Sequence, residues 1–228
     1  YPHATLTAAG AILLVSGQGT ERRRRFLIDP DWLLEKHVEA DMRSLDEWHV
    51  FKGIGPAAGF WRDRTQGPLL VPHPDNPRGS HLVLHVRKPD ERDPDGACWN
   101  FPAARSGTMK IRLRFEPEFG GAQISLTDRF FDPCDDAGEA NATYSVPIDS
   151  QYLVAEEVKL SPATWHDLHL QWNDEACRVS VDGQLITTLK AKEVPTHGLS
   201  YVRFRSRASD VDPQGFYVES IVVDIAND

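Results

Sequence analysis

The stretch "TWHDLHLQWNDEACRVSVDGQLITTL" (164–189) decides the fold of this protein. Every second residue from Leu168 to Trp172 is apolar, and the polar residues His169 and Gln171 stand between them. A period of two is typical of a β-strand that buries one face and leaves the other in water. The polar turn "NDEA" leads into a second alternating run, which ends in the tight-turn sequence "VDGQ". The stretch therefore predicts two antiparallel strands and a third strand after the glycine.

The same alternation recurs elsewhere in the chain, in "HLVLHVR" (81–87), "TMKIRLRF" (108–115) and "YVRFRSR" (201–207). The final run, "FYVESIVVDI" (216–225), is apolar on both faces, as is typical of a central strand. We count about ten or eleven strands, separated by turn residues and with no long helix between them. The pattern predicts an all-β fold, a jelly-roll sandwich of two antiparallel sheets over residues 37–228.

The first 36 residues differ in character from the rest. "GAILLVSG" (10–17) predicts a short strand, "RRRRFLID" (22–29) its returning partner, and "DPDWLLEKHV" (29–38) one or two helical turns. A lone hairpin is marginally stable in water. We therefore expect residues 1–36 to form a separate hairpin unit that packs on the rest of the chain or on a missing partner.

Composition argues against two classes of partner. The chain has 228 residues and a net charge of −9, whereas nucleic acids and anionic membranes select basic proteins. It has no run of about 18 apolar residues, so we expect no membrane span. The cluster "AAGAILLV" (8–15) is too short for a convincing signal peptide, and the localisation stays open between secreted and cytoplasmic. The chain opens on "YPHAT" without Met, and we interpret it as a piece of a longer protein.

The cysteines and histidines predict no metal site. Three cysteines form no CxxC pair, and nine histidines form no HExxH motif. His81 and His85 share one face of a predicted strand, but two histidines alone do not predict a ligand set. Calcium is the one cofactor left open, because the loop "FDPCDDAGEANAT" (131–143) is rich in carboxylates, and "PDERDPDG" (89–96) and "SDVDPQG" (209–215) are similarly acidic. The alternative is a solvated turn, since Asp and Gly are turn residues.

The stretch "WHDLHLQWNDEACRVSVDGQ" (165–184) resembles the concanavalin A-like lectin and glucanase fold. In that fold a strand that ends in Trp is followed by a polar turn and a strand that ends in Val-Asp-Gly. "FYVESIVVDI" looks like the last strand of the same fold, and the resemblance covers about residues 38–228. It implies a glycan or oligosaccharide as ligand, although the fold carries lectins, carbohydrate-binding modules, glucanases and spacers.

The segment "YPHATLTAAGAILLVSG" (1–17) resembles a late blade of a sialidase-type propeller. The resemblance implies a preceding propeller domain or chain as partner, with Tyr1 and His3 near the catalytic centre of that larger enzyme. Ala9 replaces the aspartate usual in such blades, and the chain has no Asp-box. The main catalytic residues would therefore lie outside this chain.

Three short runs combine an aromatic ring or an arginine with polar neighbours, as sugar sites do: "GFWRDR" (59–64), "CWNFP" (98–102) and "SLTDRFFD" (125–132). The candidate carbohydrate-binding residues are Trp61, Arg62, Trp99, Asn100, Asp128 and Arg129. Arginine binds carboxylates in a bidentate manner, so an acidic sugar is a plausible ligand. The alternative is that Trp61 and Trp99 are core residues.

A retaining glucanase needs two carboxylates about 5 Å apart, which this fold supplies as E-x-D-x-x-E or E-x-D-x-E along one strand. The sequence has no such run. We therefore expect a non-catalytic carbohydrate-binding or bracing module of a sialidase-like exo-glycosidase. Two alternatives stay open: a glycoside hydrolase or polysaccharide lyase that uses Asp128 and Arg129 on the sandwich itself, and a structural domain that binds no sugar.

Overall fold

The computed structural model describes residues 3–16, 24–52, 67–91, 94–155 and 157–226. The chain divides into two compact units, Tyr1–Lys36 and His37–Asp228. Among the described residues, no helix has the length and apolar character needed to cross a membrane.

The N-terminal unit is a small antiparallel sheet in the order β1-β2-β3. Its elements are β1 (His3–Leu6), β2 (Ile12–Ser16), β3 (Arg24–Ile28) and a 3-10 helix (Asp31–Leu34). The pair β2–β3 corresponds to the hairpin that the sequence predicts, and the 3-10 helix corresponds to its helical turn. The sequence missed β1, because four residues are too few to show an alternation.

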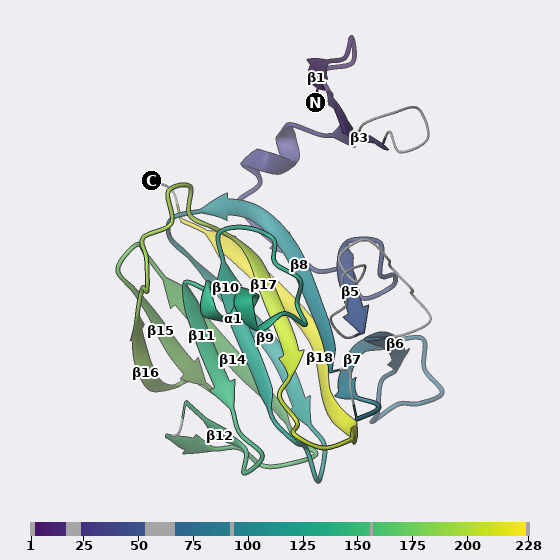
Figure 1. Ribbon diagram of the computed structural model, residues 1–228, viewed down its shortest axis with the longest axis vertical. Coiled ribbons are helices and arrows are strands. Elements are labelled where there is room, and N and C mark those ends of the chain that lie inside the picture. The colour runs from purple at the N-terminus through teal and green to yellow at the C-terminus, as the bar shows by residue number, and fades with distance from the viewer. Residues whose placement is uncertain (1–2, 17–23, 53–66, 92–93, 156, 227–228) are drawn as a thin grey trace. The chain divides into compact units, whose positions relative to one another are not determined.

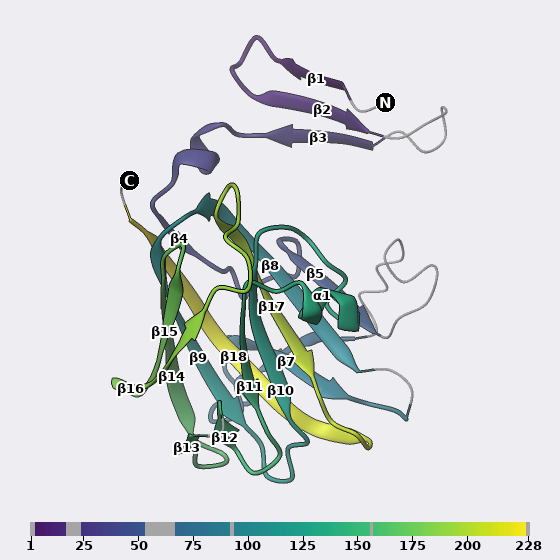
Figure 2. The ribbon, with the colours of Figure 1, turned by 60° about the vertical axis from the view of Figure 1, so that its left-hand side comes forward.

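The second unit is a two-layer sandwich, whose sheets lie face to face (Figures 1 and 2). The seven-stranded sheet has the order β13-β12-β11-β10-β17-β8-β5. Its strands are β5 (Trp48–Lys52), β8 (Asp95–Ala104), β10 (Ala122–Thr127), β11 (Tyr144–Ile148), β12 (Leu153–Val154), β13 (Val158–Lys159) and β17 (Leu199–Ser206).

The eight-stranded sheet has the order β16-β15-β14-β9-β18-β7-β6, and β4 also pairs with β18. Its strands are β4 (His37–Glu39), β6 (Leu69–Pro72), β7 (Leu82–Lys88), β9 (Gly107–Phe115), β14 (Trp165–Trp172), β15 (Ala176–Val181), β16 (Gln184–Lys190) and β18 (Asp212–Ile225). All pairings in both sheets are antiparallel. The predicted all-β sandwich of two antiparallel sheets is confirmed.

The alternation in the sequence matches the burial of the strands. In β14, Leu168, Leu170 and Trp172 are buried, whereas Gln171 is exposed on the other face. The strand β18 lies between β9 and β7, the central position that its two-sided apolar run predicts. The short strands β4, β12 and β13 were not predicted, because two or three residues carry no readable period.

The core between the sheets contains two aromatic groups at opposite ends of β9. At the start of β9, Gly107 pairs with Trp172, whose ring centroid is 6.0 Å from that of Phe101. At the end of β9, the ring of Phe115 is 4.9 Å from that of Phe119. Aromatic pairs at these distances stabilise a core beyond the area that they bury. The first group joins the two sheets, and the second packs the connection between β9 and β10 against the core.

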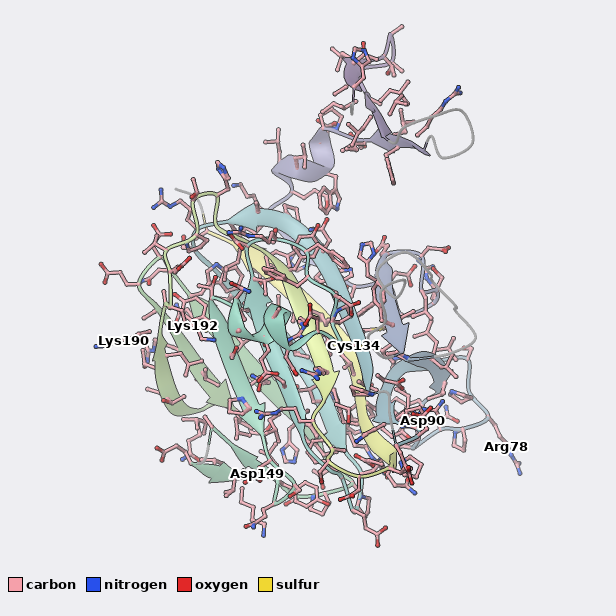
Figure 3. The ribbon with its side chains drawn as sticks, in the orientation of Figure 1. Arg78, Asp90, Cys134, Asp149, Lys190 and Lys192 are labelled. Atoms are coloured by element: carbon pink, nitrogen blue, oxygen red, sulfur yellow. The ribbon has the colours of Figure 1, made fainter. Side chains whose placement is uncertain are left out.

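The outer face of the seven-stranded sheet is covered by residues 128–143, which connect β10 to β11 and include the helix α1 (Asp136–Ala140). Figure 1 shows α1 against β10 and β17, and Figure 3 labels Cys134 in the same cover. Cys134 of the cover and Cys98 of β8 are both buried, and burial raises the pKa of the Cys98 thiol to about 12. The cover leaves hollows only along its margins, one of about 610 Å³ between α1 and β17 among those that the described residues form.

The cover also buries polar side chains that a half-solvated sheet would expose. Gln123, Ser125 and Thr127 alternate with core residues of β10 and are at most 2% exposed. Arg203 of β17 is 1% exposed and donates from Nη2 to the carbonyl oxygen of Asp135 at the start of α1. Because burying polar groups costs free energy unless they are hydrogen-bonded, the cover has to fit closely.

Gly96 of β8 is where the cover comes closest to the sheet. A Cβ atom at this position would lie 2.8 Å from the backbone carbonyl carbon of Pro133 and 3.0 Å from Sγ of Cys134. Overpacking of this kind costs about 1–3 kcal/mol. We expect Gly96→Ala to lower the free energy of unfolding by that amount and Gly96→Val to lower it further, as measured by urea denaturation. Two variants with the urea midpoint of the wild type would show that the cover is not seated at Gly96.

Candidate functional site

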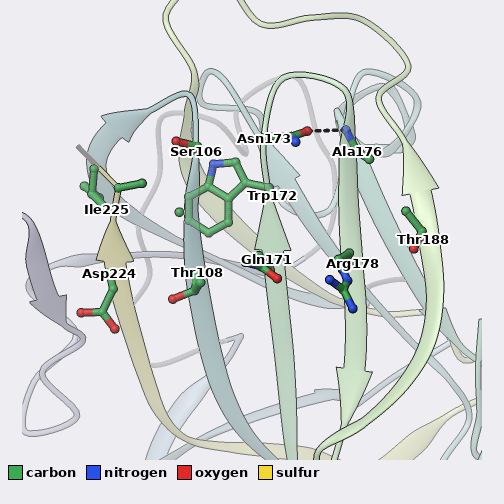
Figure 4. Close-up of a pocket in the computed structure, with 12 residues that line it drawn as sticks. Ser106, Thr108, Gln171, Trp172, Asn173, Ala176, Arg178, Thr188, Asp224 and Ile225 are labelled. Carbon is green, nitrogen blue, oxygen red and sulfur yellow. Dashed lines mark hydrogen bonds between the residues drawn. The ribbon is translucent and has the colours of Figure 1, made fainter. Parts of the chain in front are cut away.

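The outer face of the eight-stranded sheet carries a hollow of about 670 Å³ at the start of β9 (Figure 4). We call it the Trp172 hollow; it is lined by Ser106, Gly107, Thr108, Gln171, Trp172, Asn173, Ala176, Arg178, Thr188, Asp224, Ile225 and Ala226. Ligand sites commonly have volumes of about 300–1,000 Å³. The hollow is therefore large enough for one or more sugar rings.

The floor of the hollow depends on Gly107. Its strand partner is Trp172, and a Cβ atom at position 107 would lie 2.8 Å from Cζ2 of that indole. The indole Nε1 donates to the carbonyl oxygen of Ala104 at 3.3 Å, which fixes the ring. Trp172 is only 3% exposed, so it contributes the edge of its ring to the floor and is not an open stacking platform.

On the outer face of the sheet, five polar side chains that line the hollow form one row across five neighbouring strands. Thr108 pairs with Asp224 on one side and with Gln171 on the other. Gln171 pairs with Arg178, and Arg178 pairs with Thr188. Directly opposed residues of adjacent strands lie about 5 Å apart, so the row spans about 20 Å. We call these five residues the polar row.

The two charged residues of the polar row, Asp224 and Arg178, differ in their pairing. Asp224 pairs with Nδ1 of His37 at 2.7 Å, and this hydrogen bond raises the pKa of His37. Arg178 makes no ion pair within the described part of the chain, and its side chain is exposed. Such a guanidinium can bind a ligand carboxylate or hydroxyl group without first breaking an ion pair within the protein.

Further along the same face, charged side chains are paired with one another. Asp167 lies 3.0 Å from Nζ of Lys110 and 3.1 Å from Nη1 of Arg112. Burial opposes ionisation of Asp167, but the hydrogen bonds from both cations prevail and lower its pKa. These pairs leave little free hydrogen-bonding capacity for a ligand.

Trp165 lies at the far end of this face and is covered. Its ring stacks on His73 at 4.9 Å, and Cζ of Arg112 lies 5.9 Å from its centroid. Its Nε1 donates to Oδ2 of Asp75 at 2.8 Å, and this hydrogen bond is the main cause of the lowered pKa of Asp75. Trp165 therefore braces the loop before β7 and does not offer a ring face to a sugar.

Three of the residues predicted from sequence come together on the other side of the sandwich. Nδ2 of Asn100 donates to the carbonyl oxygen of Ser200 at 2.8 Å, and Oγ of Ser200 donates to that of Asp128 at 3.1 Å. Asp128 accepts two hydrogen bonds from Arg129, at 2.9 and 2.7 Å, and these bonds lower the pKa of Asp128.

Asp128 and Arg129 line a smaller hollow, of about 290 Å³. We call it the Asp128 hollow; its other lining residues are Phe131, Ala140, Asn141, Ala142, Thr143, Lys192, Glu193, Val194, Pro195 and Thr196. It lies at the edge of the cover. Because Asp128 and Arg129 are paired with each other, a ligand would have to compete with that pair.

The remaining predicted residues do not join this group. Trp99 is 3% exposed, and its ring centroid is 6.5 Å from that of Trp48 and 6.1 Å from that of Phe101. It is a core residue, the alternative that the sequence left open, and it has no ring face toward solvent. His3 lies exposed on β1 of the N-terminal unit. Tyr1, Trp61 and Arg62 lie outside the described residues.

The carboxylates of the acidic loop at 131–143 are engaged separately. Oδ1 of Asp132 accepts from the amide of Cys134, and Oδ1 of Asp135 accepts from the amide of Ala137 as a helix cap. Asp136 pairs with Arg205, as does Glu139. These carboxylates cap turns and pair with arginines. This arrangement corresponds to the alternative interpretation of the loop, a turn rich in Asp and Gly.

Sequence reasoning missed the polar row for a physical reason. Its members come from five strands, and only the register of the sheet places them side by side. One indication was present in the sequence: Gln171 and Arg178 alternate with apolar residues, which predicts that both face outward.

No protein-family model and no curated protein matches the chain. Among solved structures, it is similar to a sialidase, with a TM-score of 0.51 and 13% identity over 95% of this chain. The chain spans 21% of the length of that sialidase. It is also similar to the Emp47p carbohydrate recognition domain, with a TM-score of 0.50 and 10% identity, over 80% of this chain and 90% of that one.

A third similar structure is a glycoside hydrolase family 16 endo-glucanase from Bacteroides ovatus, with a TM-score of 0.49 and 12% identity. The match covers 82% of this chain and 99% of that one. At these identities the likeness shows the fold, which is the concanavalin A-like jelly roll of lectin domains and glycoside hydrolases. The resemblance inferred from the sequence is confirmed at that level.

Burial of Trp99 predicts that its replacement affects stability. Truncation of a buried tryptophan to alanine costs about 3–5 kcal/mol. We expect Trp99→Ala to lower the free energy of unfolding by that amount in urea. The exposed-site control Arg129→Ala should change it by less than about 0.5 kcal/mol. A Trp99→Ala protein as stable as the wild type would contradict the core position.

His85 predicts a dependence of stability on pH. Its Nε2 donates to the carbonyl oxygen of Gln214 at 2.6 Å, and burial lowers its pKa below the usual value. Below about pH 6.5 the unfolded chain therefore binds a proton that folded His85 does not, and the free energy of unfolding falls as the pH falls.

We expect His85→Gln, which keeps the hydrogen-bond donor, to lose less stability than the wild type between about pH 7.5 and pH 5.5. Urea midpoints at the two pH values measure the effect. His197→Gln, at an exposed position, is the control and should keep the wild-type difference. Equal losses in the wild type and His85→Gln would contradict the assignment.

Proposed function

We propose that the sandwich is a non-catalytic carbohydrate-binding module and that the Trp172 hollow is its glycan site. The observation that supports this most directly is the polar row, in which five hydrogen-bonding side chains follow one line across the outer face of the sheet, in a hollow that Trp172 and Ile225 also line. Sites for sugars combine an apolar surface with a few polar groups that fix orientation. The fold, shared with lectin domains, is consistent with this role.

The residues of the polar row offer different kinds of hydrogen-bonding group to a glycan. Gln171 both donates and accepts, and Thr108 and Thr188 each carry a hydroxyl that does the same, which suits sugar hydroxyl groups. Arg178 adds a cation that binds a carboxylate in bidentate geometry. A glycan that carries an acidic sugar, such as a sialic or uronic acid, would use both features.

The hollow is poorly suited to hydrolysis. Glycosidases need two carboxyl groups about 5–9.5 Å apart. Asp224 is the one carboxylate among the residues that line the hollow, and it is paired with His37. A module with this lining binds a glycan and leaves the chemistry to another domain.

That other domain is, in this proposal, a sialidase-like propeller that precedes the sandwich. The similarity to part of a much longer sialidase, together with the propeller-like sequence of residues 1–17, supports it. Tyr1 and His3 would then belong to the active centre of the larger exo-glycosidase. Residues 1–228 alone should hydrolyse no glycoside.

A second function, a hydrolase or lyase on the sandwich, has one observation in its favour. The Asp128 hollow is lined by two carboxylates, Asp128 and Glu193, beside Arg129. Arg129 keeps Asp128 ionised, so Asp128 could act as a base or stabilise a cation, but not donate a proton as a general acid.

Glycan binding by matched variants tests the proposed site. We expect the wild-type chain to bind selected acidic oligosaccharides on a glycan array. Arg178→Ala should reduce the affinity at least about ten-fold, as loss of a charged hydrogen bond predicts, with a smaller reduction for Gln171→Ala. Arg129→Ala, an equivalent change in the Asp128 hollow, should leave the affinity unchanged.

The reverse result for the two arginine variants would indicate that glycans bind in the Asp128 hollow. If Arg129→Ala abolishes binding while Arg178→Ala does not, the Asp128 hollow is the site. Release of sugar from the bound glycans by the wild type, lost in Glu193→Gln, would establish the catalytic alternative. No binding to any glycan would contradict both and favour the bracing role.

A further inference from the structure

Three side chains with metal-binding atoms meet on the outer face of the eight-stranded sheet. Nitrogen atoms of His73 and His81 and a carboxylate oxygen of Glu219 all lie within 4.8 Å of one another. In the described part of the chain no other three such residues come this close together. They lie apart from the Trp172 hollow, since none of them lines it.

The fold brings the two histidines together at the base of a loop. The amide of His73 donates to the carbonyl oxygen of His81 at 3.0 Å, which closes the loop between β6 and β7. Their rings stack with centroids 5.0 Å apart, and the ring of His73 stacks in turn on Trp165. Both rings are therefore held in place without a ligand.

The third group is placed by an irregularity in β18. The register of β18 against β9 shifts between Val218 and Ser220, so Glu219 is the extra residue of a β-bulge. Val218 and Ile221 both remain buried, which puts Glu219 on the outer face. Bulges are common beside functional sites, where they redirect one side chain. Here the carboxylate of the bulge residue lies beside the two imidazoles.

The distances fit a small tetrahedral cation. Oε1 of Glu219 lies 3.2 Å from Nε2 of His73 and 3.8 Å from Nδ1 of His81. Two ligand atoms that are each about 2.1 Å from a tetrahedral zinc ion lie about 3.4 Å apart. Zinc would therefore fit between these atoms after small rotations of the side chains.

We propose that His73, His81 and Glu219 form a binding site for a divalent transition metal, with zinc as the best match. Two imidazoles and one carboxylate select zinc over calcium or magnesium, which prefer oxygen ligands. The side chain of His81 is 53% exposed, so the fourth position faces solvent and would hold water. The site would link the β6–β7 loop to β18.

The surroundings position each ligand. Nε of Arg112 lies 2.6 Å from Oε2 of Glu219, which leaves Oε1 for the metal. Nδ1 of His73 accepts from the amide of Asp75 at 3.2 Å, so the neutral ring carries its proton on Nε2. Metal binding replaces that proton, which moves to Nδ1, and the Asp75 amide loses this acceptor. Such partners of the ligands tune metal affinity.

Zinc titration of the whole chain, measured by calorimetry, tests the site. We expect one zinc ion per chain, and visible absorption bands of a tetrahedral site when Co²⁺ is used instead. His81→Ala and Glu219→Gln should each weaken zinc binding at least about ten-fold. His169 lies on β14, outside the cluster. The control variant His169→Ala, which removes this histidine, should bind zinc as the wild type does.

Folding is checked separately, since Glu219 also pairs with Arg112. The side chain of His81 is 53% exposed and its ring contact is with His73, so the metal-free melting temperature of His81→Ala should fall by only a few degrees. Zinc should raise the melting temperature of the wild type and not that of His81→Ala. No saturable uptake by the wild type, or equal weakening by His169→Ala and His81→Ala, would overturn the proposal.

Discussion

The structure depends on the burial of one chain of aromatic rings that joins the two sheets. Trp48 and Trp99 of the seven-stranded sheet contact each other, Phe101 follows, and Trp172 completes the chain from the eight-stranded sheet. Burial of such large side chains is the main source of folding free energy. The indole of Trp172, the last ring of this series, lies so close to Gly107 that no side chain fits at position 107. The packing of the core therefore determines the shape of the hollow at this point.

The two outer faces of the sandwich differ in how far they are covered by other parts of the chain. Residues 128–143 cover the seven-stranded sheet and bury its polar side chains, including Arg203. The outer face of the eight-stranded sheet carries the polar row at one end and the cluster around Glu219 further along. We infer that the first face contributes stability, whereas the second face presents the groups that bind a glycan and a metal.

Much of the fold could be predicted from the sequence, because alternation reports directly on which residues of a strand are buried. Leu168, Leu170 and Trp172 are buried as their spacing indicates. The site was harder to predict, since the polar row exists only through strand register and only the folded chain brings Glu219 beside His73 and His81. Trp99 shows the limit most plainly: a tryptophan beside an asparagine is as consistent with a core as with a sugar platform, and only its packing decides.

The most direct test of the central claim is an NMR titration of the isotope-labelled chain with the oligosaccharide that binds best. We expect saturable shifts of the backbone amides of Thr108, Gln171 and Arg178 and of the indole N–H of Trp172, all of which belong to residues that line the hollow. Shifts confined to the surroundings of Asp128, or no saturable shifts with any glycan, would contradict it.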